Sequence, residues 1–257
     1  MARSSSKWDW LLILGIFIAI SLTEYVFACR DVRIGIVMAL FTALGIYFVI
    51  SVKEMYAQVV NAAECLALVP IYILLTSSLP WFFIHQAYLL PAVYATIIGL
   101  CFFYVYEKQL SFEELGFKKD KILKYTLIGV IIGLPFGTIE YFILTPAPVY
   151  PTFEFVHLLR DAIYMLFFVA LGEELLFRAL IQRNLSFAFG TTIGLVSASF
   201  MFAVMHLTWR SVPELIFVFF GGMVLGYLYY KTESLTAPII VHAVGNTMLV
   251  GVLPYVL

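Results

Sequence analysis

Long apolar runs separated by short polar breaks dominate this chain, and they fix the solvent in which it can fold. A helix needs about 20 mainly apolar residues to cross a bilayer, and the 257 residues hold eight or nine such runs. Only 12% of the residues are charged, whereas about a quarter are charged in soluble domains. The runs are continuously apolar instead of alternating, which favours helices over a barrel. The sequence therefore predicts an all-α, polytopic transmembrane helical bundle with approximate spans 8–28, 34–52, 62–84, 86–106, 125–145, 161–182, 188–208, 213–230 and 235–255.

Two connections between the spans can be predicted from their length and polarity. Only His85 and Gln86 separate the third and fourth spans, which predicts a tight helical hairpin. The one long polar stretch, Glu107 to Lys124, is expected to be a solvated linker with a topogenic charge cluster, and an interfacial helix and a turn is the other reading. This stretch divides one integral membrane domain into N-terminal helices with the linker (residues 1–124) and a C-terminal core (residues 125–257).

The placement of Lys and Arg predicts the orientation, because cytoplasmic loops carry an excess of both. With nine spans and a cytoplasmic N-terminus, eleven of the 15 basic residues fall on the cytoplasmic side: Arg3, Lys7, Lys53, Lys108, Lys118, Lys119, Lys121, Lys124, Arg178, Arg183 and Lys231. The other side receives Arg30, Arg33, Arg160 and Arg210. We therefore expect a multi-pass protein of the cell membrane with its N-terminus in the cytoplasm. A formal net charge of -1 gives no indication of nucleic-acid binding.

Three charged residues lie deep in the sixth apolar run, where a charge costs at least about 2.5–3.5 kcal/mol and is a functional candidate by default. They are Glu173, Glu174 and Arg178. Adjacent glutamates point about 100° apart on a helix, so the two should have different roles. Arg178 follows Glu174 by four residues, which predicts an intrahelical ion pair and leaves Glu173 free to face a cavity. The plain alternative is a buried charge network with no chemistry.

Two further polar pairs lie on other predicted helices. His206 follows Phe202 by four residues, and His242 precedes Asn246 by four residues. The second spacing puts an imidazole and a carboxamide on one helical face, where both can donate hydrogen bonds to one oxygen. A satisfied core histidine and a polar clasp between helices are the plain alternatives.

Other polar and small residues in the spans carry a weaker signal. Glu140 could line the same cavity, although packing or interfacial roles are expected for it and for Glu24 and Glu64. Small residues at 221, 222 and 226 predict a close helix-packing surface, with a substrate groove as the second reading.

Taken together, Glu173-Glu174-x-x-x-Arg178, Phe202-x-x-x-His206 and His242-x-x-x-Asn246 resemble the three motifs of the CAAX-protease and bacteriocin-processing family. These are polytopic intramembrane proteases of the glutamic type. The resemblance covers roughly the last 100 residues, and the first 120 carry no diagnostic signal. It implies that residues 125–257 hold the catalytic core.

The resemblance also implies a role for each motif residue. Glu173 would be the general base that activates water, and His206 would hold that water or shuttle a proton. His242 and Asn246 would stabilise the tetrahedral oxyanion. Glu174 and Arg178 would shape the site. These roles agree with physics, because a carboxylate in a low-dielectric site is a better base and one preformed oxyanion donor is worth about 2.7–4 kcal/mol.

The predicted spans place these residues at different depths. Glu173 falls near mid-membrane, His242 lies about 10 Å inside the cytoplasmic edge at 1.5 Å per residue, and His206 sits near the far end of its span. For the three to meet, the seventh helix must start later, tilt, or end at a deep loop that contains residues 208–213.

The expected activity is intramembrane endopeptidase cleavage of a membrane-associated or lipidated protein or peptide, within the lipid bilayer. We expect no cofactor, because the resemblance implies metal-free catalysis and the His-Glu-x-x-His spacing of zinc peptidases is absent. Zinc held by two histidines and a glutamate is the alternative. A non-catalytic immunity or scaffold protein of the same fold remains a rival. So does a proton-coupled small-solute transporter, although the inverted repeats typical of transporters are not evident.

Overall fold

The computed structural model describes residues 6–257, and this part of the chain is helical throughout, without a strand. It contains nine helical stretches that are long and apolar enough to cross a membrane. The predicted all-α multi-pass fold is therefore confirmed, and the nine stretches overlap the nine predicted spans one for one. Arg3, used in the orientation argument, lies outside the described residues.

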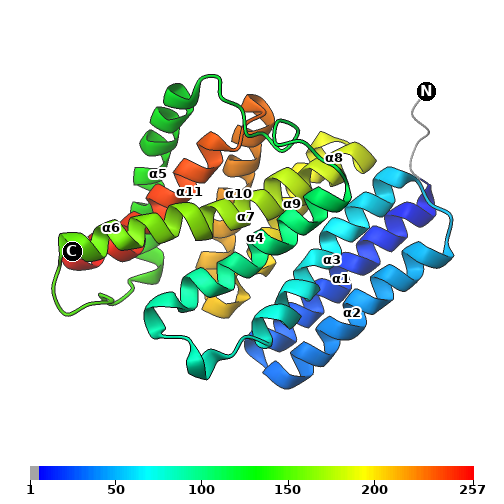
Figure 1. Ribbon diagram of the computed structural model, residues 1–257, viewed down its shortest axis with the longest axis horizontal. Coiled ribbons are helices and arrows are strands. Elements are labelled where there is room, and N and C mark those ends of the chain that lie inside the picture. The colour runs from blue at the N-terminus through cyan, green and yellow to red at the C-terminus, as the bar shows by residue number, and fades with distance from the viewer. Residues whose placement is uncertain (1–5) are drawn as a thin grey trace.

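The first three helices form a regular group at one side of the molecule (Figure 1). They are α1 (Lys7–Cys29), α2 (Val32–Val52) and α3 (Ala57–Ser77). A capping box starts α1, because the Ser6 hydroxyl accepts from the Asp9 amide and the Asp9 carboxylate accepts from the Ser6 amide. Buried alanines on α2 and α3 allow the helices to approach closely; they are Ala39, Ala43, Ala62 and Ala63.

The connection between the third and fourth spans is longer than predicted. Helix α3 ends at Ser77, and α4 (Leu89–Glu107) follows two short 3-10 turns at Trp81–Phe83 and Gln86–Tyr88. The predicted hairpin at His85 and Gln86 is therefore wrong. Pro80 accounts for the early end, since proline cannot donate to a helical hydrogen bond and disfavours the helical conformation of the preceding residue.

The polar linker forms turns, which agrees with the linker reading, and the interfacial helix of the other reading is absent from it. No helix occurs between Lys108 and Lys121, and Gly116 adopts a φ of +95° that a helix cannot accommodate. The Gly116 carbonyl accepts from the Leu235 amide at 3.0 Å, and Lys118 pairs with Glu233 at 2.9 Å. The linker is thereby tied to the loop between the last two spans.

The sixth span is a single helical stretch from Phe155 to Phe189, longer at both ends than predicted. It begins as α6 (Phe155–Tyr164), and two π-helical segments, Met165–Ala170 and Leu175–Gln182, flank the short α7 (Leu171–Glu174) before α8 (Arg183–Phe189). Such π-turns widen the helix locally and occur mostly at functional sites. Both predicted glutamates lie in α7, between the two π segments.

The seventh span contains a short helix, which resolves the conflict over depth. Helix α9 (Thr191–Val204) has 14 residues, so it is about 21 Å long at 1.5 Å per residue and shorter than the roughly 30 Å hydrocarbon core. His206 follows its end, and a 3-10 turn at Leu207–Trp209 leads toward α10 (Val212–Thr232). Of the three predicted possibilities, the structure has two: the helix starts later than residue 188, and it ends before His206.

Helix α11 (Thr236–Thr247) packs closely against α5 (Ile122–Leu144). The close approach is possible because glycines of α5, one helical turn apart, face α11. A Cβ added at Gly133 would lie 2.7 Å from Val244 Cβ and 2.8 Å from the Val241 carbonyl oxygen. One added at Gly137 would overlap the Gly245 carbonyl. The absent side chains therefore let the two backbones approach, and this close approach fixes the helix that carries His242 and Asn246.

The three glycines of α10 have two different roles: two of them allow close helix packing, and one lines a cavity. An added Cβ at Gly222 would lie 3.2 Å from Ser199 Cα, and one at Gly226 would lie 2.5 Å from Leu195 Cδ1. These two positions confirm the predicted close helix-packing surface. Gly221 instead lines a cavity.

Candidate active site

The predicted pair of charges on the sixth span forms a buried ion pair. Arg178 Nε donates to Glu174 Oε2 at 2.9 Å, and both side chains are fully buried. The pair confirms the four-residue spacing argument. It also removes Arg178 from the loop charges that orient the chain, because its guanidinium is enclosed by protein; the other basic residues still favour the same orientation.

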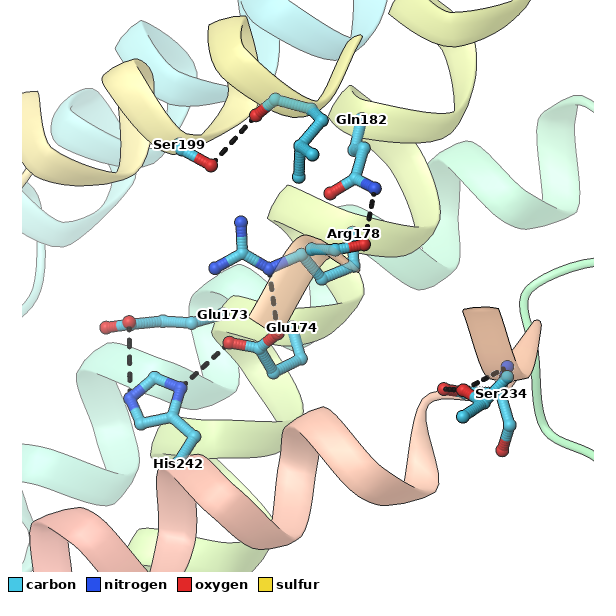
Figure 2. Close-up of polar contacts among 10 residues, drawn as sticks. Glu173, Glu174, Arg178, Gln182, Ser199, Ser234 and His242 are labelled. Atoms are coloured by element: carbon cyan, nitrogen blue, oxygen red, sulfur yellow. Dashed lines mark hydrogen bonds and ion pairs between the residues drawn. The ribbon is translucent and has the colours of Figure 1, made fainter. Parts of the chain in front are cut away.

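One imidazole contacts both glutamates (Figure 2). His242 Nδ1 lies 2.9 Å from Glu174 Oε1, and His242 Nε2 lies 3.7 Å from Glu173 Oε2. The two carboxylates do point in different directions, yet the two nitrogens of one ring on α11 reach both. This arrangement links the first and third motifs through one ring, and the two carboxylates lie at different distances from it.

The second motif is built around the ring of Phe202. The Arg178 guanidinium carbon lies 4.8 Å from the centre of this ring, within cation–π range. The ring also contacts the rings of His206 and His242, with centroids 4.8 and 5.9 Å away. Phe202 therefore packs between the residues of the other two motifs and supports the buried cation.

His206 has one ring nitrogen committed to the backbone. Its Nδ1 lies 2.8 Å from the Phe202 carbonyl oxygen, and since a carbonyl only accepts, Nδ1 must carry the proton. In the neutral ring this leaves Nε2 as an acceptor. A histidine just beyond the helix end is thus held in the form that can accept a hydrogen bond from water.

A cavity of about 40 Å³ lies beside these side chains. A water molecule needs about 10–15 Å³ of such volume and several polar partners, so the cavity has room for water. Its polar lining comes from four residues on three spans: Glu140, His206, His242 and Asn246. Apolar residues complete the wall, with Phe136, Phe217 and Gly221 among them. The structure therefore brings the second and third motifs to one hollow.

Glu173 lies at the edge of this arrangement. Its Oε1 accepts from the Tyr94 hydroxyl at 2.8 Å, while its Oε2 is buried without a hydrogen-bond partner among residues 6–257. The oxygen that faces His242 is thus the one left available for chemistry. Tyr94, on α4, was not predicted, because a single tyrosine in an apolar run carries no signal in a chain with 16 of them.

Two acidic side chains share the neighbourhood of the cavity. Glu140, predicted as a possible lining residue, does line it. Glu214 on α10 interacts electrostatically with Glu140 and is fully buried, yet no pattern in the sequence singles it out. An acidic residue in the first turn of a helix is expected for its dipole alone, and Ser211 caps this helix on the Glu214 amide.

The remaining predicted acidic residues lie elsewhere. Glu64 pairs with Lys108 at 2.6 Å, which agrees with a packing role. Glu24 is buried in α1 and does not line the cavity. Within the described part of the chain, no three His, Cys, Asp or Glu side chains are grouped so as to hold a metal ion.

Comparison with known proteins gives one match. Residues 155–248 match the family model described as type II CAAX prenyl endopeptidase Rce1-like. This range contains all three motifs and confirms the resemblance drawn from them; the described family is one of proteases. No curated protein and no solved structure matches the chain.

Proposed function

We propose that this chain, whose residues 155–248 form an Rce1-like CAAX prenyl endopeptidase domain, is an intramembrane endopeptidase that cleaves a membrane-associated or lipidated protein or peptide. One observation carries the proposal. Spans distant in sequence bring two imidazoles and a carboxamide around a hollow large enough for water, and the Glu173 carboxylate lies 3.7 Å from one of these imidazoles. Hydrolysis needs these groups and that water together.

The proposed reaction begins with proton transfer from water to Glu173. Oε2, which has no other partner, accepts this proton while the water oxygen attacks the peptide carbonyl carbon. His206 Nε2 accepts a second hydrogen bond from the same water and orients it. Glu173 then passes the proton to the amide nitrogen as the C–N bond breaks, which releases an amine and a new carboxylate.

The developing oxyanion requires donors. In this mechanism Asn246 supplies its side-chain amide, and His242, protonated on both nitrogens, supplies Nε2–H while Nδ1–H remains bonded to Glu174. Preformed donors of this kind usually give the largest stabilisation of the transition state. Arg178 holds Glu174, and Glu174 holds His242, so the buried ion pair fixes the orientation of the ring.

The test is cleavage of a defined peptide. We would reconstitute the protein in lipid and supply a fluorogenic CAAX peptide in farnesylated and unmodified forms, with mass spectrometry to locate the cut. Wild-type protein should cleave internally, and His206→Ala at an equal membrane level should be slower by about 10²–10⁴-fold. Equal rates for the two would remove His206 from the mechanism. Absence of any cleavage across lipidated peptides would favour the scaffold or transporter alternatives.

The same assay tests the cofactor. Without a catalytic metal, activity should survive a chelator, and purified protein should lack stoichiometric zinc. Loss of activity with the chelator and its return with zinc would overturn the metal-free mechanism.

A further inference from the structure

Helix α4 belongs to the N-terminal part of the chain, outside residues 155–248, yet it runs against the segment that carries the glutamates. Gly172, directly before Glu173, permits this contact. A Cβ added at Gly172 would lie 3.3 Å from Ile98 Cγ1 and 3.7 Å from Tyr94 Cδ1. The close approach leaves Tyr94 packed beside the first motif.

The Tyr94 hydroxyl makes a directed contact with the site. It lies 2.8 Å from Glu173 Oε1 and must be the donor if the carboxylate is ionised. A carboxylate has two equivalent oxygens, and its terminal torsion is soft, so an unrestrained Glu173 could turn either oxygen toward His242. The hydrogen bond removes this freedom, since it occupies Oε1 and leaves Oε2 on the side of His242.

We propose that Tyr94 is a positioning residue for Glu173, which makes α4 part of the proteolytic machinery. The inference rests on the proposed function. The Tyr94 hydroxyl is bonded to the Glu173 oxygen that faces away from His242, so it acts through the carboxylate and not on the substrate. Its hydroxyl selects the oxygen that takes the proton from water and keeps that oxygen in place through turnover.

Another tyrosine on the same helix provides a matched control. Tyr104 is 3% exposed, and its hydroxyl donates to the Asn61 carbonyl at 3.4 Å, away from the motif residues. Tyr94→Phe and Tyr104→Phe make the same chemical change on one helix. A purely structural role for the hydroxyl would give the two variants similar effects.

The experiment measures kcat and KM for the farnesylated fluorogenic peptide, per folded protein, in wild type, Tyr94→Phe, Tyr104→Phe and Glu173→Gln. Tyr94→Phe should lower kcat by about 10- to 100-fold, the loss expected for one hydrogen bond to a charged group. KM should stay within about twofold, because the interaction acts in the transition state and not in substrate binding. Tyr104→Phe should retain both constants.

Three outcomes would overturn the positioning role: wild-type kcat in Tyr94→Phe, a raised KM with unchanged kcat, or equal losses in both tyrosine variants. If Glu173→Gln is inactive in any of these cases, the proposed function stands and only the role of Tyr94 falls. Full activity of Glu173→Gln would instead remove the glutamate mechanism and the positioning role with it.

Discussion

The N-terminal helices and the C-terminal spans are both apolar enough to cross a membrane, but their backbone conformations differ. Helices α1, α2 and α3 run for 23, 21 and 21 residues as α-helix. The spans from Phe155 onward include π-helical segments, a 14-residue helix and a 3-10 turn beside the site. The irregular backbone occurs where the buried charges meet (Figures 1 and 2).

Buried charge follows the same division. In the C-terminal part, Glu174, Arg178 and His242 are linked by short contacts, whereas Glu24 in α1 is a solitary buried acid and Glu64 pairs with Lys108 where both are partly exposed. The difference indicates that the first helices supply a frame and that irregular segments hold the chemistry. Tyr94 on α4 is the N-terminal residue whose hydroxyl contacts Glu173 in the candidate site.

The largest difference should come from breaking an ion pair in each part. Arg178→Met leaves Glu174 buried with only His242 opposite, and loss of one partner of a buried pair costs about 3–5 kcal/mol. Lys108→Met breaks the partly exposed pair with Glu64, which is worth about 0–1 kcal/mol. Thermal unfolding in detergent measures both. Equal destabilisation by the two substitutions would show that the ion pairs of the two parts contribute equally to stability.

Asparagine substitutions compare chemistry in the two parts. Asn246→Ala removes a proposed oxyanion donor and should lower kcat by about 10²–10³-fold with little change in KM. Asn61→Ala on α3 should leave both constants unchanged. A kcat for Asn246→Ala within threefold of wild type would exclude this side chain as an oxyanion donor.

Glycine-to-alanine substitutions compare how tightly helices pack in the two parts of the molecule. Gly133→Ala forces a methyl group against Val244 and Val241, and overpacking of this kind costs about 1–3 kcal/mol. Gly45→Ala on α2 meets nothing within 4 Å and should stabilise by up to about 1 kcal/mol through helix propensity. Unfolding midpoints of the two variants should move in opposite directions; a shift in the same direction would contradict the close α5–α11 packing.

The smallest effect concerns the linker, outside the spans. The hydrogen bond from Lys118 lowers the pKa of Glu233 below its ordinary value of 4.5 and raises that of Lys118. A lowered carboxyl pKa stabilises the fold above pH 4.5, and that stabilisation is lost as the pH falls through the lowered value. Glu233→Gln should therefore lower Tm by about one degree at pH 7. The difference from wild type should shrink as the pH is lowered through the titration of Glu233, and a difference that does not change with pH would argue against the ion pair.

The sequence predicted what depends on spacing along one helix. Glu174 with Arg178 is a four-residue pair, and hydropathy located every span. It could not predict what depends on how helices approach: the shared contact of His242 with both glutamates, the Tyr94 hydrogen bond or the burial of Glu214. These contacts depend on glycines and π-turns, whose geometric consequences are set by tertiary packing.

The central claim is that the Glu173 carboxylate activates water for peptide hydrolysis, and paired glutamate substitutions test it most directly. Single-turnover cleavage of the farnesylated peptide would be compared for Glu173→Gln and Glu24→Gln, with both proteins shown to be folded. We predict that Glu173→Gln loses at least about 10²-fold in rate while Glu24→Gln matches wild type. Cleavage by Glu173→Gln at the wild-type rate would contradict the account.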